Sequence, residues 1–269
     1  MKRCCLLLIY TLLCWAAQAQ CEAVNKAFKS GEHVTYDLYF NWKFVWVKAG
    51  TAHMKIKDTT YNNKPAYHTF LQTKGNKRAD FFFIMRDTLE SVMSTDLVPY
   101  YFRKGAEEGK RYTLDEVHFS YKDGVSYIAQ SRLRKDRKPK YSSYSEPRCV
   151  YDMLSILARA RSFDPSDYTV GQKIRFPMAT GAAIEEQTLI FRGKEIIEAN
   201  DKKLYRCLKF SLVEYKENKE KEVITFFISD DQNHLPVRLD MYLNFGSAKA
   251  FLTSVKGNRH PITSRVEED

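Results

Sequence analysis

The stretch VTYDLYFNWKFVW, residues 34–46, decides the fold class, because its side chains alternate with a period of two. Every even position carries an apolar or aromatic side chain, whereas Thr35, Asp37 and Asn41 are polar. This period is typical of a β-strand that buries one face. The alternation resumes after Gly50 in AHMKIK, residues 52–57, so we expect a bulge or a tight bend at this glycine.

Similar segments continue along the chain, separated by turn sequences such as YNNKP (61–65), AEEG (106–109) and KDG (122–124). They predict about a dozen strands joined mainly by hairpins, and therefore an antiparallel sheet. A sheet of that size must twist and curl. The predicted fold is mainly β: one large curved antiparallel sheet, half-barrel or barrel-like, with one inserted amphipathic helix.

The inserted helix is predicted within CVYDMLSILARARSFD, residues 149–164. Asp152 is a suitable N-cap, Ser155 is a capping partner rather than a nucleophile, and Asp164-Pro165 ends the helix. The expected buried face has the spacing i, i+3, i+4, i+7 and comprises Met153, Ile156, Leu157 and Ala160. We expect this helix to close one mouth of the curved sheet or to pack on its concave side.

The first residues combine a basic start, an apolar run and the small-residue pattern Ala17-Gln18-Ala19, which predicts a secretory signal peptide over residues 1–19. We expect export, most simply to the periplasm of a Gram-negative bacterium. A lipid anchor on Cys21 is the alternative. A flexible mature N-terminus (20–30), a single β-rich domain (31–258) and a C-terminal tail (259–269) should follow. No later apolar run is long enough to span a membrane.

Three cysteines, Cys21, Cys149 and Cys207, remain after the signal peptide. An odd and sparse set is no disulfide framework, so the alternatives are one bridge, Cys149 to Cys207, or buried thiols with a free one. Removal of the signal peptide lowers the formal charge from +10 to +8. For an exported protein this excess excludes nucleic acid and leaves lipid phosphate, anionic glycan, an acidic protein or simple solubility.

The sequence contains no motif for catalysis or for a cofactor. Its six histidines lack metal-ligand spacing, and there is no Gly-x-Ser-x-Gly, P-loop or dinucleotide fingerprint. We therefore predict no catalytic residue, metal or cofactor, while enzymatic activity and oligomeric state stay open.

Two sets of residues are candidates for binding. The aromatic face of the opening stretch can line an apolar cavity inside the curl, through Tyr36, Leu38, Phe40, Trp42 and Trp46. The basic run RLRKDRKPK (132–140) can dock on an anionic envelope component, through Arg132, Arg134, Arg137 and Lys138. A filled aromatic core and a solvated loop are the competing structural interpretations.

Three segments together resemble a known family. They are GEHVTYDLYFNWKFVWVKAGTAHMKI (31–56), YDMLSILARAR (151–161) and FFISDDQNHLPVRLDMYLNFGSAKAFLTSV (226–255). They are similar to the bacterial exported family known as the domain of unknown function numbered 3108, from about Phe28 to Gly257. The resemblance implies an all-β curved sheet with an inserted helix, similar in architecture to the half-barrels of lipoprotein carriers. It implies no catalytic residues.

Three functional hypotheses remain. The first is a non-enzymatic exported module that binds an apolar or amphipathic ligand, a lipid or an acyl chain, in the concave sheet. The second is a structural or interaction protein of the envelope that docks through the basic run. The third is a hydrolase of envelope polymers, which would need a polar cleft with a carboxylate or histidine of shifted pKa.

Overall fold

The computed structural model describes residues 21–42, 45–80, 84–135, 137–166, 168–217, 219–243 and 246–266. The predicted signal peptide lies outside these residues. The helices are α2 (Lys77–Asp80) and α3 (Met153–Arg161). The strands are β1 (His33–Trp42), β2 (Val45–Tyr61), β3 (Lys64–Gly75), β4 (Met85–Ser94), β5 (Pro99–Glu108), β6 (Arg111–Lys122), β7 (Val125–Arg134), β8 (Lys140–Glu146), β9 (Lys173–Ala179), β10 (Ile184–Glu198), β11 (Leu204–Lys216), β12 (Lys219–Ser229), β13 (Pro236–Leu243), β14 (Gly246–Lys256) and β15 (Arg265–Val266).

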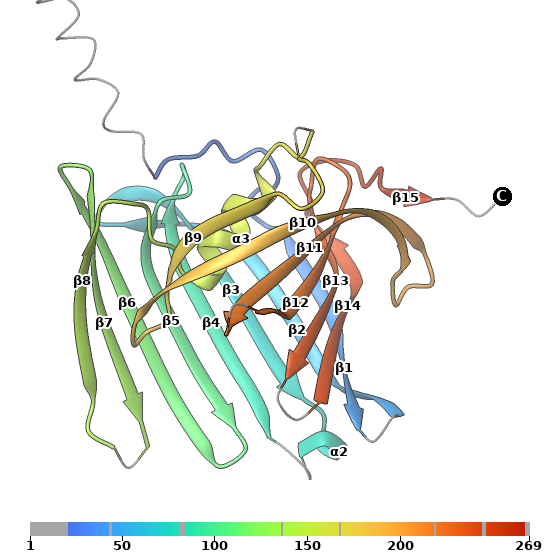
Figure 1. The fold of residues 1–269 in the computed structure, drawn as a ribbon, viewed down its shortest axis with the longest axis horizontal. Coiled ribbons are helices and arrows are strands. Elements are labelled where there is room, and N and C mark those ends of the chain that lie inside the picture. The colour runs from blue at the N-terminus through green and yellow to red at the C-terminus, as the bar shows by residue number, and fades with distance from the viewer. Residues whose placement is uncertain are drawn as a thin grey trace, which may run out of the picture.

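All these strands belong to one sheet, with the order β8-β7-β6-β5-β4-β3-β2-β1-β14-β13-β12-β11-β10-β9, and β15 pairs with β11 (Figure 1). Consecutive strands are neighbours in the sheet from β1 to β8 and from β9 to β14, and the pair of β1 with β14 joins these two runs, which leaves β8 and β9 at the two edges. Every ladder between strands is antiparallel, as short hairpin connections require. The predicted large, curved antiparallel sheet with an inserted helix is confirmed.

Gly50 lies at an irregularity between β1 and β2, as expected. Leu38 pairs with Gly50 and Tyr39 pairs with Lys48, so Ala49 is the extra residue of a bulge. A Cβ atom on Gly50 would lie 2.2 Å from the carbonyl oxygen of Lys74 on β3. Only glycine lets the two strands approach this closely.

The two edges of the sheet meet without a ladder between β8 and β9 in the described part of the chain. The turn between β9 and β10 instead lies on β6 and β7. The Gly181 amide donates to Oε1 of Gln130 (2.8 Å), and Arg132 donates to the carbonyl oxygen of Thr180 (2.7 Å). Gly181 has φ +83°, and a Cβ there would lie 2.4 Å from that of Asp115. The sheet is therefore joined at its edges by side chains.

Helix α3 begins where predicted. Asp152 accepts from the amides of Leu154 and Ser155, and the Ser155 hydroxyl accepts from the Asp152 amide, which completes a capping box. The Asp152 carboxylate also accepts from Ser91 of β4 at 2.9 Å. Burial raises the pKa of Asp152, and these hydrogen bonds oppose the rise.

The predicted buried face of α3 is wrong. The buried residues are Leu154, Ser155, Ala158 and Arg161, and Met153 is exposed. Two of the four are polar, so a pattern of apolar residues cannot identify this face. Ser155 is buried because it completes the cap, and Arg161 because a buried carboxylate pairs with it.

That carboxylate belongs to Glu32. Arg161 donates to both Glu32 oxygens, at 2.6 and 2.9 Å, and twice to the carbonyl oxygen of Asn233. Its guanidinium lies over the ring of Phe28. The side chains of Arg161 and Glu32 are 2 % and 0 % exposed. This cluster joins the N-terminal segment, α3 and the β12–β13 turn at one end of the sheet.

The predicted flexible N-terminus, residues 20–30, is packed where the structure describes it. Ala27 and Phe28 are fully buried, and Asn25 bonds the backbone of Ala27 and Phe28. The predicted C-terminal tail also packs, because β15 pairs with β11 and Ser264 is buried. Both segments cover the end of the sheet that holds α3.

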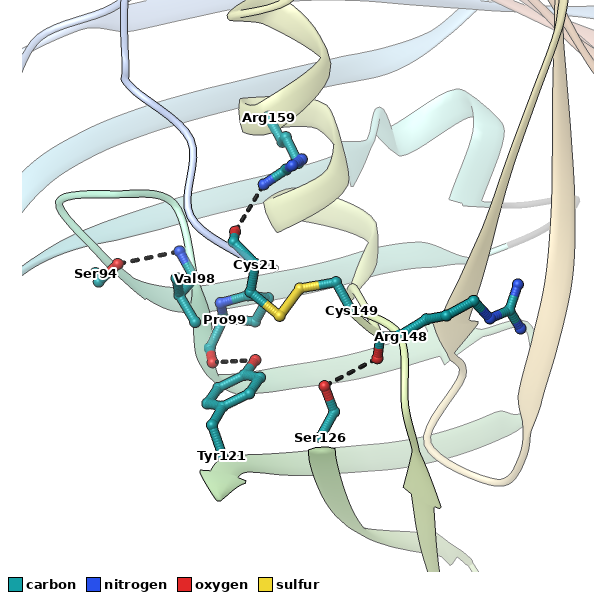
Figure 2. Close-up of a disulfide and its surroundings, with 9 residues drawn as sticks. All are labelled: Cys21, Ser94, Val98, Pro99, Tyr121, Ser126, Arg148, Cys149 and Arg159. Atoms are coloured by element: carbon teal, nitrogen blue, oxygen red, sulfur yellow. Dashed lines mark hydrogen bonds between the residues drawn. A yellow bond between two sulfur atoms is a disulfide. The ribbon is translucent and has the colours of Figure 1, made fainter. Parts of the chain in front are cut away.

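The disulfide pairing differs from the predicted one. Cys21 is bonded to Cys149, just before α3, and Arg159 donates to the Cys21 carbonyl oxygen at 2.7 Å (Figure 2). Cys207 is a buried free thiol, and burial raises its pKa to about 12. The Cys21 sulfur is occupied, so the alternative of a lipid anchor on Cys21 is inconsistent with this structure.

Candidate functional site

The inner face of the sheet is defined here as the face that carries α3. Residues directly opposite one another in an antiparallel ladder lie on the same face. Ser91, which bonds the α3 cap, therefore shares its face with the rest of its cross-strand row. This row runs across β3 to β7 and comprises Thr69, Ser91, Phe102, Val117 and Gln130.

Burial on the inner face decreases along the strands. At the end that holds α3, the inner-face residues are below 9 % exposed, for example Val34, Ile56 and Val117. Towards the end that holds α2, several become partly exposed, for example Phe40, Thr73 and Met241, whereas Leu89, Ala106 and Asp115 stay buried. Figure 1 shows the two helices at these opposite ends. The interior is filled at the α3 end and more accessible at the α2 end.

One side of this partly exposed region is apolar. A single cross-strand row runs from β1 through β14, β13 and β12 to β11. All five of its residues are apolar and partly exposed: Phe40, Ala248, Met241, Ile224 and Leu212. Such a row presents a continuous hydrocarbon surface across five strands.

The other side, on β3 to β7, is polar. One row comprises Thr73, Asp87, Ala106, Thr113 and Arg134. The adjacent row comprises Leu71, Leu89, Lys104, Asp115 and Arg132. Met85 of β4 and Met241 of β13 each pack against the core cluster that β1, β2 and β10 to β14 form. Apolar and polar walls thus face one interior.

Several buried polar atoms on the polar side have no hydrogen-bond partner among the described residues. They are Oγ1 of Thr69, Oγ1 of Thr73, Oδ1 of Asp87 and Nε2 of Gln130. Buried polar atoms in folded proteins are nearly always bonded to protein or to ordered water. Thr69 and Gln130 are in the filled row next to α3, whereas Thr73 and Asp87 are opposite one another at the partly exposed end, where ordered water or a bound molecule can satisfy them.

Asp87 is the most perturbed carboxyl group of the polar side. Burial raises its pKa to about 6, Lys104 lowers it and Glu108 raises it further. Nearby, Asp115 and Arg132 form a bidentate pair at 2.6 and 2.9 Å, which raises the pKa of Arg132. Lys104 makes no ion pair with any residue that the structure describes. Oδ1 of Asp87 and the Lys104 ammonium thus lack a hydrogen-bond or ion-pair partner among the described residues, and they interact with each other through their charges.

The structure separates the residues of the predicted aromatic site. Tyr36 and Leu38 are in the core, and the Tyr36 hydroxyl donates to the Pro236 carbonyl oxygen at 3.0 Å. Phe40 is at the partly exposed end of the inner face. Trp42 ends β1, and its side chain lies outside the described residues.

Trp46 is on the opposite face. Trp42 pairs with Val45, so the chain reverses there and Trp46 pairs with Asn41. The sequence does not reveal this hairpin, because apolar or aromatic side chains occupy every even position from 34 to 46 without a break at residues 43 and 44. Trp46 lies under the ammonium of Lys249 and is 40 % exposed.

The basic run is also divided. Arg132 belongs to β7 and is bound to Asp115 and to the β9–β10 turn, so it holds the edges of the sheet together. Arg134, Arg137 and Lys138 are exposed.

Sequence reasoning missed Thr73, Asp87 and Lys104, because each is an isolated polar residue that only the strand register brings onto one face.

A second feature is a groove of about 480 Å³ beside β10, lined by residues 195–200 with Arg238 and Phe251. Arg238 lies 5.0 and 5.4 Å from the rings of Phe227 and Phe251 and forms a bidentate pair with Asp240. The guanidinium of Arg238 is therefore already paired with a carboxylate and stacked on two aromatic rings of the same chain. This groove is better explained as packing between strands than as a ligand site.

Within the described residues, no helix has the length and hydropathy of a membrane span. The same residues contain no group of three or more histidine, cysteine or acidic side chains with the geometry of a metal site.

Comparison with known proteins identifies the family. Residues 35–253 match the family described as "Protein of unknown function (DUF3108)". The chain therefore belongs to this family, which confirms the resemblance seen in the sequence. No curated protein matches the chain.

A solved structure has a similar fold. It is the crystal structure of a beta-barrel-like protein of the domain of unknown function DUF1849 from Brucella abortus. The TM-score is 0.54 at 8 % sequence identity, over 85 % of this chain and 98 % of that chain. At this identity the likeness concerns the fold alone.

Proposed function

We propose that this protein binds an amphipathic molecule, a lipid or an acyl chain with a polar head, on the partly exposed inner face of its sheet. The hydrocarbon part lies along the apolar row of β1 and β11–β14. The polar part lies against Thr73, Asp87 and Lys104. No bond is made or broken, so the activity is carriage or sequestration.

The observation that carries this proposal is the pairing of an apolar row with unpartnered polar atoms on one interior surface. Phe40, Met241 and Ile224 are partly exposed, although apolar side chains inside a sheet of this size are normally covered. Thr73 and Asp87 carry buried oxygen atoms that have no hydrogen-bond partner among the residues the structure describes. A ligand with a hydrocarbon tail and a polar head would satisfy both surfaces.

Export to the periplasm is part of the proposal. The predicted signal peptide supports it, and so does the bond between Cys21 and Cys149, because disulfides persist in oxidising compartments. Docking on an anionic envelope component through the basic run is the second candidate. The exposure of Arg134, Arg137 and Lys138 supports it.

The test is uptake of a fluorescent fatty acid by delipidated protein, together with mass spectrometry of material that co-purifies with the native protein. Ala248→Trp should fill the space above the apolar row and weaken uptake at least tenfold. Ser247→Trp is the matched control, because it adds the same side chain to the opposite face of β14. Thermal unfolding checks that both variants are folded.

No uptake by the wild-type protein, with no co-purifying lipid, would refute binding. Undiminished uptake by a folded Ala248→Trp variant would refute the assigned surface. For the basic run, serine at Arg134, Arg137 and Lys138 should abolish salt-sensitive association with envelope fractions, and unchanged association would refute docking.

A further inference from the structure

We propose that Thr73, Asp87 and Lys104 recognise the head group of a phosphoethanolamine lipid, with its primary ammonium on Asp87 and Thr73 and its phosphate on Lys104. This inference rests on the proposed function and names its ligand class. It is carried by three side chains on three adjacent strands that share the inner face.

Thr73 and Asp87 form the ammonium site. They are directly opposite one another on β3 and β4, so their side chains are neighbours on one face. Both carry an oxygen atom that is buried and has no partner within the described chain. A primary ammonium has three donors and no acceptor, so it can satisfy both oxygens and neutralise the carboxylate at the same time.

Lys104 forms the phosphate site. It is on β5, directly opposite Leu89 and diagonal to Asp87 on the same face, and its charge lowers the pKa of Asp87. It is directly opposite Asp115, but Asp115 is held by Arg132 in a bidentate pair. Adjacent strands are about 4.8 Å apart, a separation that suits a head group whose two charges are joined by a two-carbon spacer.

Other head groups fit less well. A phosphoglycerol head is only anionic, so Asp87 would repel it. A phosphocholine head has no N–H donor for Oδ1 of Asp87 or Oγ1 of Thr73, and quaternary ammonium is normally bound by aromatic rings. The residues in the two polar rows across β3 to β7 are not aromatic. The site therefore distinguishes a primary ammonium from its methylated analogue.

Apolar side chains lie next to this site on β3 and β4. Met85 is two positions from Asp87 on the same face of β4, and Leu71 is two positions from Thr73 on β3. Both pack against the cluster that also contacts Met241 of the apolar row. An acyl chain that leaves the head-group site thus meets apolar side chains.

The experiment titrates delipidated protein with three fluorescent lysophospholipids that have the same acyl chain and carry phosphoethanolamine, phosphocholine or phosphoglycerol heads. Wild-type protein should bind the phosphoethanolamine lipid at least tenfold more tightly than the other two. Asp87→Asn should remove this preference, and Lys104→Gln should weaken binding of all three. Glu90→Gln, on the opposite face of β4, is the matched control and should behave as wild type.

Equal binding of the three lipids by wild-type protein, or an unchanged preference in Asp87→Asn, would overturn the head-group assignment and leave the proposed function standing. Failure of wild-type protein to bind any of the three lipids, or the fluorescent fatty acid, would overturn both. Because Asn is isosteric with Asp and removes a buried charge, we expect the Asp87→Asn variant to fold. Its thermal unfolding curve provides the check.

Discussion

Replacement of Arg161 by methionine should lower the free energy of unfolding by about 3–5 kcal/mol, the usual cost of removing one partner from a buried ion pair. Glu32 would keep a buried carboxylate without a counter-charge, since its side chain is 0 % exposed. The Asn233 carbonyl oxygen would lose both of its donors from Arg161. Methionine preserves most of the side-chain volume, so the loss is mainly electrostatic.

The assay is urea unfolding under non-reducing conditions, followed by tryptophan fluorescence and repeated by thermal unfolding. For a domain of this size the loss corresponds to a fall of about 10 °C in Tm. Arg159→Met is the control on the same helix. Arg159 is partly exposed and donates to the Cys21 carbonyl oxygen, so its replacement should cost about 1 kcal/mol.

A double variant separates the pair from its surroundings. Glu32→Gln combined with Arg161→Met removes both charges, and the double variant should be more stable than the sum of the two single effects predicts. A loss below about 1 kcal/mol in Arg161→Met, equal to that of the control, would refute the argument. Strict additivity in the double variant would show that the ion pair is not what holds Arg161 inside.

Three further predictions concern other parts of the fold. Cys149→Ser opens a disulfide that joins positions 128 residues apart and should cost about 4–5 kcal/mol, with urea unfolding then insensitive to reductant. Asp87→Asn should stabilise the protein by about 1–2 kcal/mol at pH 7.5 and by almost nothing at pH 4, because the pKa is raised to about 6 in the folded state. The carboxyl group's favourable contribution is present below pH 4 and lost as the pH rises through 6, so an equal effect at both pH values would contradict the assignment. Gly181→Ala should lower the free energy of unfolding by at least about 2 kcal/mol, and Gly171→Ala by about 1 kcal/mol. Both glycines have positive φ, but only at Gly181 would an added Cβ lie closer than 3 Å to a side chain. Equal losses of stability in thermal unfolding would contradict the close contact.

Local chemistry was sufficient to predict several elements. The strands follow from a period-2 pattern that each segment carries by itself, and the hairpin turns from the residues that tolerate positive φ. Helix α3 starts directly after its N-cap Asp152, and this start could be predicted because the cap needs only residues within three positions. Gly50 marked a bulge because glycine inside a strand usually means close approach of a neighbour.

Long-range contacts decided what the sequence could not. The buried face of α3 depends on Glu32, which is 129 residues from Arg161, and the partner of Cys149 depends on how the N-terminal segment crosses the end of the sheet that holds α3. The reversal after Trp42 places Trp46 on the other face, although the alternation of side chains is unbroken.

The candidate site shows the same division. The apolar character of Phe40 and Met241 and the charge of Asp87 and Lys104 are properties of the sequence. Their position on one inner face depends on the register of the strands from β11 through β1 to β5, and a shift of one residue in any ladder would move a side chain to the other face. The sequence therefore determined which strands and helix form, whereas the register and the closing contacts determined which side chains face a ligand.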